Sequence, residues 1–303
     1  MLLSAGGFAI YRSESNVFNL LVPHFGRMRS QRDRQKLLDV WLRSKLFRVS
    51  GLEAREISAK ITADCRNGGD FLRIVMQAIA CQQGVLRWAD CTPEHLLYME
   101  EIKRQIPHAL FIHIIRDGRD VALSYARQGW SHPLPWDRKE RLGVAGLYWE
   151  WLVRKGRDQG SRLEADYLEV RFEDLVAKPK ETLSRLGAFI DHDLDYERIR
   201  SAAIGSVSEP NSSFTEDSEG SFSPVARWKS KMSAEQIAAF EELAGEFLLE
   251  LGYGPPSQVK RGTTLRAARL RATYWAMFEG KLWMRTHTPL GRFVQLERIE
   301  IEP

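Results

Sequence analysis

The chain has 303 residues, of which 44% are hydrophobic and 28% are charged, and its formal net charge at pH 7 is +4. This length and composition describe a globular protein with one large core or two modest ones, and they exclude a fibrous or largely disordered chain. The mild positive charge fits a protein that handles a small polyanion better than one that coats nucleic acid.

The cysteines and the hydropathy pattern indicate the compartment. Cys65, Cys81 and Cys91 are odd in number and lack the paired spacing of a metal site, so we expect free thiols rather than disulfides. No apolar run approaches the length of a membrane span, and no charged-then-apolar leader precedes a cleavage site. These features predict a cytoplasmic protein.

The N-terminal quarter predicts one strand and several helices. Residues 1–7 resemble the end of a helix with a Gly-Gly turn, and Phe8 to Tyr11 predict a strand. Residues 27–64 carry a run of charges ahead of apolar residues, which indicates helices that form a cap with a solvated charged face. The predicted buried residues of a further helix over residues 68–83 are Phe71, Leu72, Ile74, Val75 and Ile79.

A turn into a helix follows at Arg87 to His95. Thr92 suits the N-cap position, and Pro93 suits the first helical position. We therefore expect a helix that begins at Pro93 and carries His95 in its first turn.

The segment from Ala109 to Trp130 is the most informative part of the chain. Leu110 to Ile115 is an apolar run short enough to be a buried strand, and a charged turn and a helical pattern follow it. Ligands bind at the carboxyl ends of strands in such sheets. Arg116 and Ser124 would offer a guanidinium, a hydroxyl and helix N-terminal amides to one anion, and a phosphate fits best. The structural alternative is an ion-paired helix start with Asp117 as the N-cap.

The next segments alternate between predicted elements and a loop. A helix with Leu183, Leu186 and Ile190 at helical spacing is predicted after Lys178 and Pro179. Tyr148 and Trp151, one helical step apart, are interpreted as core aromatics rather than as a platform for a substrate. Residues 205–224 are polar and aperiodic, which predicts a mobile loop.

Two features mark the end of the core and the tail. Ser233 and Gln236 have capping-box spacing for a helix that runs to Leu251 and stops at Gly252. Beyond a Pro-Pro break, residues 260–293 interleave basic and aromatic side chains. This mix fits an amphipathic helix on an anionic membrane or a partner, or a helix packed on the core with its basic side in water. We favour the packed helix.

The nine residues from Arg116 to Ser124, Arg-Asp-Gly-Arg-Asp-Val-Ala-Leu-Ser, resemble the 3′-phosphate-binding motif of sulfotransferases that use 3′-phosphoadenosine 5′-phosphosulfate (PAPS). Three further segments resemble the same family in the same order, namely residues 87–95, 167–175 and 227–229 with 251–253. The chain is identified as resembling PAPS-dependent sulfotransferases, close to the tyrosylprotein and carbohydrate branch.

This resemblance implies roles for six residues. Arg116 and Ser124 would hold the 3′-phosphate, with Arg227 assisting and Lys229 a weaker contact. In the tyrosylprotein branch a glutamate after the first helix is the general base, which implies that role for Glu14. A histidine near the strand-to-helix turn is the base in the cytosolic small-molecule branch, which implies it for His95. The structural alternatives are a surface glutamate near a helix start and a half-exposed histidine.

One family feature has no counterpart in the sequence. The family begins with a buried strand and a Gly-x-Pro-Arg-Ser-Gly-Thr-Thr-like loop around the 5′-phosphosulfate, and nothing here resembles that loop. The resemblance starts at the end of the helix that normally follows it. Either the start codon is assigned at an internal methionine, or the gene is truncated and its product binds the cofactor weakly or not at all.

Together these features predict an α/β protein with a P-loop-NTPase-like three-layer sulfotransferase fold. Its central parallel sheet would lack the first strand, residues 1–254 would form the domain, and residues 255–303 would form a helical extension. The expected activity is sulfuryl transfer from PAPS to a hydroxyl or amine of a small-molecule, carbohydrate or peptide acceptor, without a metal or a nucleic acid partner. Weak membrane-surface or protein contact is expected through residues 260–293. The alternative is a non-catalytic relative that binds a nucleotide or a partner.

Overall fold

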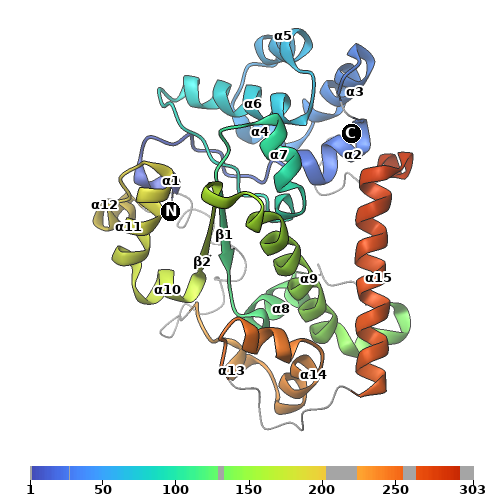
Figure 1. The fold of residues 1–303 in the computed structure, drawn as a ribbon. Helices are drawn as coiled ribbons and strands as arrows, with labels where there is room; N and C mark the ends of the chain where they lie inside the picture. The colour runs from blue at the N-terminus through green and yellow to red at the C-terminus, as the bar shows by residue number, and fades with distance from the viewer. Residues whose placement is uncertain (1, 27, 129–132, 203–223, 255–263, 294–303) are drawn as a thin grey trace.

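The computed structural model describes residues 2–26, 28–128, 133–202, 224–254 and 264–293. Most of these residues are helical, and a small parallel sheet lies at the centre (Figure 1). The N-terminal elements are α1 (Leu2–Ala5), the π-helix η1 (Val17–Leu21), α2 (Val22–Phe25), α3 (Gln31–Trp41), α4 (Lys45–Ser50), α5 (Ala54–Asp64) and α6 (Gly68–Gln82). The central elements are the 3₁₀ helix η2 (Pro93–Tyr98), α7 (Met99–Gln105), β1 (Phe111–Ile115), α8 (Gly118–Arg127), η3 (Pro135–Glu140), α9 (Arg141–Ser161), η4 (Glu164–Asp166) and β2 (Tyr167–Arg171).

The remaining elements are helices. They are α10 (Phe172–Ala177), α11 (Pro179–Ile190), α12 (Tyr196–Ala202), α13 (Trp228–Lys231), α14 (Ala234–Glu250), α15 (Leu265–His287) and the 3₁₀ helix η5 (Pro289–Phe293). In Figure 1, α10 to α12 lie on one side of the strands and α9 lies on the other. The predicted α/β class is therefore observed, with a larger share of helix than a central sheet suggests.

The two strands pair in parallel, and this pairing decides where the site lies. Phe111 is opposite Tyr167 at one end, and Ile115 is opposite Arg171 at the other. The carboxyl ends of both strands therefore meet at the same edge of the sheet, where α8 and α10 begin. The predicted strand–turn–helix after Leu110 is confirmed.

Two sequence predictions about strands are wrong. Residues 8–11 form no strand, because only Phe8 makes an isolated parallel bridge, to Arg87. The strand β1 is not fully buried, because Ile114 is 51% exposed. Among the described residues β1 pairs on one side alone, so its other edge has no strand partner.

The cores follow the helix patterns that the sequence shows. The largest apolar cluster joins η1 to α7 with Trp151 of α9, and it contains the five residues predicted to be buried in α6. Tyr148 packs on the same cluster, which confirms the interpretation of both aromatics as core. A second cluster joins the end of β1 to α8, α9 and α14. The capping box of Ser233 and Gln236 is present at the start of α14.

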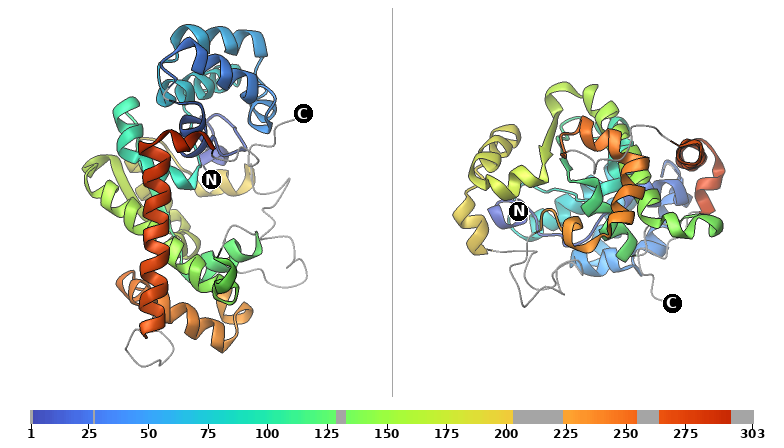
Figure 2. Two further views of the ribbon diagram at one scale, coloured as in Figure 1. Left: turned by 90° about the vertical axis from the view of Figure 1, so that its right-hand side faces the viewer. Right: turned by 90° about the horizontal axis from the view of Figure 1, so that it is seen from below.

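The tail helix α15 packs on the body of the protein. It packs against α9 and α14, and in the side view of Figure 2 α14 lies near one end of this long helix. Tyr274 is fully buried, Trp151 donates a hydrogen bond to Glu279 (2.9 Å), and Arg271 pairs with Glu150 (2.8 Å). The favoured packed-helix alternative is confirmed. No helix in the described part of the chain is long and apolar enough to cross a membrane.

Candidate functional site at the carboxyl end of β1

Arg116 leaves the sheet at the point where β1 ends. Because β1 and β2 end in register, Arg116 lies beside the first residue of α10, and its guanidinium carbon is 4.9 Å from the centre of the Phe172 ring. This contact holds the cation over an aromatic face, where it is partly shielded from solvent. The Arg116 side chain is 21% exposed.

The turn after Arg116 is built as an ion-paired helix start. The Asp117 carboxylate accepts a hydrogen bond from the Arg119 amide (2.9 Å), so Asp117 is the N-cap of α8. The Arg119 guanidinium is 3% exposed and pairs with Asp117 (2.8 Å) and with Glu241 of α14 (3.2 Å). The structural reading of Asp117 is thus confirmed, and it leaves Arg116 available for a separate role.

Residues 224–228 return to the same place from a distant part of the chain. The Asp120 carboxylate accepts hydrogen bonds from the amides of Ala226 and Trp228, both at 2.9 Å. Arg116 donates through Nη2 to the carbonyl of Pro224 (2.5 Å). The guanidinium of Arg119 lies 3.7 Å from the centre of the Trp228 ring. These contacts bring the segment that carries Arg227 to the end of β1.

The Arg116 guanidinium has a buried donor that the contacts above do not use. The Nε–H of Arg116 is buried and has no acceptor among the residues that the structure describes. A buried, unsatisfied donor on a cation is costly, and the cost is removed when an anionic oxygen binds there. Arg116 therefore fits an anion that the described residues do not supply.

The other predicted phosphate contacts lie on neighbouring elements. Ser124 is half-buried on the second turn of α8. Arg227 is half-buried and directly precedes α13, whereas Lys229 on α13 is exposed. The predicted mobile loop over residues 205–224 lies outside the described residues except for Pro224.

The two predicted bases belong to segments that meet. Residues 15–18 and 90–95 are joined by hydrogen bonds from the Ser15 amide to Asp90 (3.1 Å), from the Asn16 amide to Thr92 Oγ1 (3.3 Å) and from the Phe18 amide to His95 Nε2 (3.2 Å). Glu14 immediately precedes this junction, and its side chain is exposed. A base role for Glu14 stays a prediction.

His95 differs from the expected half-exposed histidine, because it is buried. Its Nδ1 lies 2.8 Å from the Asp90 carboxylate, and its Nε2 accepts the Phe18 amide. Burial raises the pKa of Asp90, but hydrogen bonds from His95 and Ser15 outweigh burial and hold that pKa below its usual value. Both ring nitrogens are thus engaged, and a base role for His95 requires release of the Phe18 amide.

The helix start at Pro93 is confirmed, with one difference in its cap. The first turns are a 3₁₀ helix, and the Thr92 hydroxyl does not cap it. That hydroxyl instead accepts the Asn16 amide from a segment more than seventy residues away. A tertiary contact has replaced the local cap that the sequence pattern predicts.

Several residues of the strand edge were not predicted. Glu173 accepts the Asp117 amide (2.9 Å) and the Tyr253 hydroxyl (3.1 Å), and Tyr253 also lies 3.1 Å from the Ile115 carbonyl. Asp120 is 2% exposed. Arg116 precedes the N-cap of α8, so helical spacing did not indicate the contact of Arg116 Nη2 with Asp120 Oδ2 (3.5 Å).

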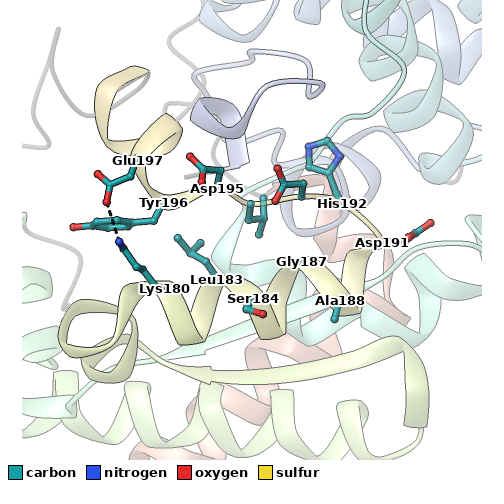
Figure 3. Close-up of a pocket in the computed structure, with 12 residues that line it drawn as sticks. Lys180, Leu183, Ser184, Gly187, Ala188, Asp191, His192, Asp195, Tyr196 and Glu197 are labelled. Atoms are coloured by element: carbon teal, nitrogen blue, oxygen red, sulfur yellow. Dashed lines mark ion pairs between the residues drawn. The ribbon is translucent and has the colours of Figure 1, made fainter.

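A pocket outside the strand edge lies between α11 and α12. Its volume is about 600 Å³, it is open to solvent, and Figure 3 shows its lining side chains. Among its acidic side chains, Asp195 accepts the Arg198 amide (2.6 Å), and Glu197 pairs with Lys180 (3.0 Å). None of the predicted site residues lines this cavity. Within the described ranges no group of three or more His, Cys, Asp or Glu residues could hold a metal ion.

The fold and site thus define an α/β protein with buried and half-buried arginines at the carboxyl edge of a parallel strand pair. The model of the family described as "Sulfotransferase family" matches residues 11–196, which is more than half of the chain. The protein belongs to the sulfotransferase family.

Two further comparisons complete the picture. Among solved structures, the chain is similar to one titled "Sulfotransferase Domain from the Curacin Biosynthetic Pathway", with 15% sequence identity and a TM-score of 0.40. The likeness covers 65% of this chain and 70% of that one. A search of curated proteins finds no match.

Proposed function

We propose that the protein is a PAPS-dependent sulfotransferase that transfers the sulfuryl group of PAPS to a hydroxyl or amine acceptor. The observation that carries this proposal is the buried Nε–H of Arg116, which has no acceptor among the described residues and lies at the end of β1. The family match supports the reaction class. We also propose that the fold is the three-layer, P-loop-NTPase-like arrangement. The two described strands, β1 and β2, would belong to its central parallel sheet.

In the proposed donor site, the protein's cations hold the end of the nucleotide that does not react. Arg116 and Ser124 bind the 3′-phosphate of the donor, and Arg227 adds a second guanidinium from the segment that Asp120 tethers. Guanidinium groups suit this task because their planar N–H donors match phosphate oxygens. Lys229, which is exposed, contributes only a screened charge.

In the proposed transfer, Glu14 takes the proton from the acceptor as the acceptor attacks sulfur. A bond forms between the acceptor oxygen or nitrogen and sulfur, and the bond from sulfur to the bridging oxygen of the 5′-phosphate breaks. The products are the sulfated acceptor and 3′-phosphoadenosine 5′-phosphate. A carboxylate base is expected to contribute about 100-fold or more to such a step. His95 is the second candidate for this role.

Transfer of labelled sulfuryl from PAPS to a panel of phenols, carbohydrates and tyrosine-containing peptides tests the proposal. The expected result is a labelled product whose formation falls when adenosine 5′-phosphosulfate, which lacks the 3′-phosphate, replaces PAPS. Equal use of the two donors contradicts the roles of Arg116 and Ser124. Nucleotide binding without transfer to any acceptor supports the alternative of a non-catalytic relative.

A further inference from the structure

The Asp120 carboxylate connects two parts of the candidate site that are more than one hundred residues apart in the chain. Its side chain is buried, and its two oxygens accept different backbone amides. Oδ2 accepts the Ala226 amide and Oδ1 accepts the Trp228 amide, each at 2.9 Å. The two bonded residues flank Arg227 on either side. The backbone of Arg227 is therefore fixed from both directions by one carboxylate.

The tethered backbone has a conformation that it would not adopt alone. Ala226 has a φ of 61°, in the left-handed region that residues with a Cβ rarely occupy. Such a conformation costs about 1 kcal/mol or more and persists only where the surroundings hold it. The hydrogen bond from the Ala226 amide to Asp120 is one such restraint, and the contact of Trp228 with Arg119 is another.

Asp120 is also coupled to Arg116. Nη2 of Arg116 lies 3.5 Å from Asp120 Oδ2 and donates to the Pro224 carbonyl of the tethered segment. With Nη2 committed in this way, the unsatisfied donor of Arg116 is Nε–H. A change at Asp120 would therefore alter both the tethered segment and the orientation of the Arg116 fork.

We propose that Asp120 is a positioning residue of the donor site, which holds Arg227 beside Arg116 so that both guanidinium groups address one phosphate. This inference rests on the proposed function. It predicts that removing the Asp120 charge changes phosphate affinity in the direction opposite to that expected from charge alone. Removal of a negative charge near two arginines should tighten phosphate binding if charge alone mattered. Loss of the tether should weaken it.

The test measures the preference for 3′-phosphoadenosine 5′-phosphate over AMP by calorimetry, because the two nucleotides differ only in the 3′-phosphate. Asp120→Asn is expected to reduce this preference about tenfold, the loss that one charge-assisted hydrogen bond produces, with little change in the affinity for AMP. A general loss of structure would instead weaken both nucleotides. Glu169→Gln is the control, because it removes a carboxylate of β2 that pairs with Arg157 and lies outside the proposed donor site. It should keep the wild-type preference.

A second pair of variants leaves α8 intact, in case Asp120→Asn does not fold. Ala226→Pro removes the amide that Asp120 binds and excludes the left-handed φ, so it should reduce the preference as Asp120→Asn does. Ala226→Gly keeps the amide and the φ, and it should leave the preference unchanged.

The outcomes separate the two proposals. An unchanged or increased preference in Asp120→Asn, or in Ala226→Pro if the first variant does not fold, overturns the positioning role. A wild-type protein that does not distinguish the two nucleotides overturns the proposed function itself. If Arg116→Ala loses the preference but Asp120→Asn and Ala226→Pro both keep it, the proposed function stands and Asp120 has no positioning role in the donor site.

Discussion

The carboxyl end of β1 and the junction of residues 15–18 with residues 90–95 hold the two halves of the proposed chemistry, and they differ in construction. At the strand end, arginines and carboxylates are buried together in ion pairs around Arg119. At the junction, neutral and acidic side chains accept backbone amides, and His95 is one of them. Buried ion pairs supplement backbone hydrogen bonds in the first region, whereas backbone hydrogen bonds and the contact of His95 with Asp90 hold the second.

This difference has a consequence for function. In the strand-end region the structural charges are satisfied within the protein, so a cation with a remaining donor, Arg116, stands out as a ligand-binding group. At the junction the most obvious candidate, His95, uses both ring nitrogens within the protein, whereas Glu14 remains exposed. The comparison favours Glu14 over His95 as the base.

The largest expected effect is on the stability of the strand-end region. Arg119→Met leaves the buried carboxylates of Asp117 and Glu241 without this partner, and the expected loss is about 3–5 kcal/mol. Urea unfolding followed by circular dichroism measures it. Arg162→Met, which removes exposed pairs with Glu100 and Asp158, is the control and should barely move the midpoint. Similar small shifts for both variants would show that the buried network does not hold this region.

The next effect separates the two bases at the junction. Glu14→Gln should lower kcat about 100-fold or more while the unfolding midpoint stays the same, because the side chain is exposed. His95→Gln, in contrast, should lower the unfolding midpoint, because it disrupts the contacts with Asp90 and Phe18. Steady-state kinetics and urea unfolding of both variants measure this. Wild-type kcat in Glu14→Gln would assign the base elsewhere.

The third prediction concerns acid sensitivity of β1 itself. His113 is buried, and burial lowers its pKa from 6.5 to about 4, with a smaller contribution from Arg157. Between pH 4 and pH 6.5, His113 is protonated in the unfolded chain but neutral in the folded protein. Stability is therefore fully present above pH 6.5 and declines as the pH falls toward 4.

The loss from His113 between pH 7 and pH 5 is expected to be about 2 kcal/mol. Urea unfolding of the wild type and of His113→Gln at the two pH values measures it, because the variant lacks the titrating group. The same pH dependence in both proteins would rule out His113 as the source.

The smallest effect is expected at Lys229. Its ammonium group is exposed beside the strand-end region, so Lys229→Ala should weaken binding of 3′-phosphoadenosine 5′-phosphate only about two- to threefold, and less at high salt. Calorimetry at two salt concentrations checks this. A loss as large as that of an arginine variant would mean that Lys229 contacts the phosphate directly.

The sequence predicted those parts of the fold that local patterns determine. The apolar run before Arg116, the periodicity of α6 and the capping box at Ser233 all mark elements that the structure contains. The failures come from tertiary contacts. Residues 8–11 have strand-like side chains but only Phe8 makes a bridge, and the Thr92 hydroxyl bonds a distant amide instead of its own helix.

The candidate site shows the same division. Arg116 could be predicted because the topology of a parallel sheet puts the residue after a strand at the ligand-binding edge. The burial of His95 could not, because it depends on Phe18, whose ring packs against it at 5.4 Å. The importance of Asp120 also escaped prediction, since its partners lie more than one hundred residues downstream.

The most direct test of the account is the affinity of Arg116→Ala for 3′-phosphoadenosine 5′-phosphate, measured by calorimetry beside the wild type. Loss of a partly buried cation that pairs with phosphate should weaken binding by about 2–4 kcal/mol, which is about 30- to 700-fold. Affinity equal to that of the wild type would contradict the assignment of the β1 end as the donor site.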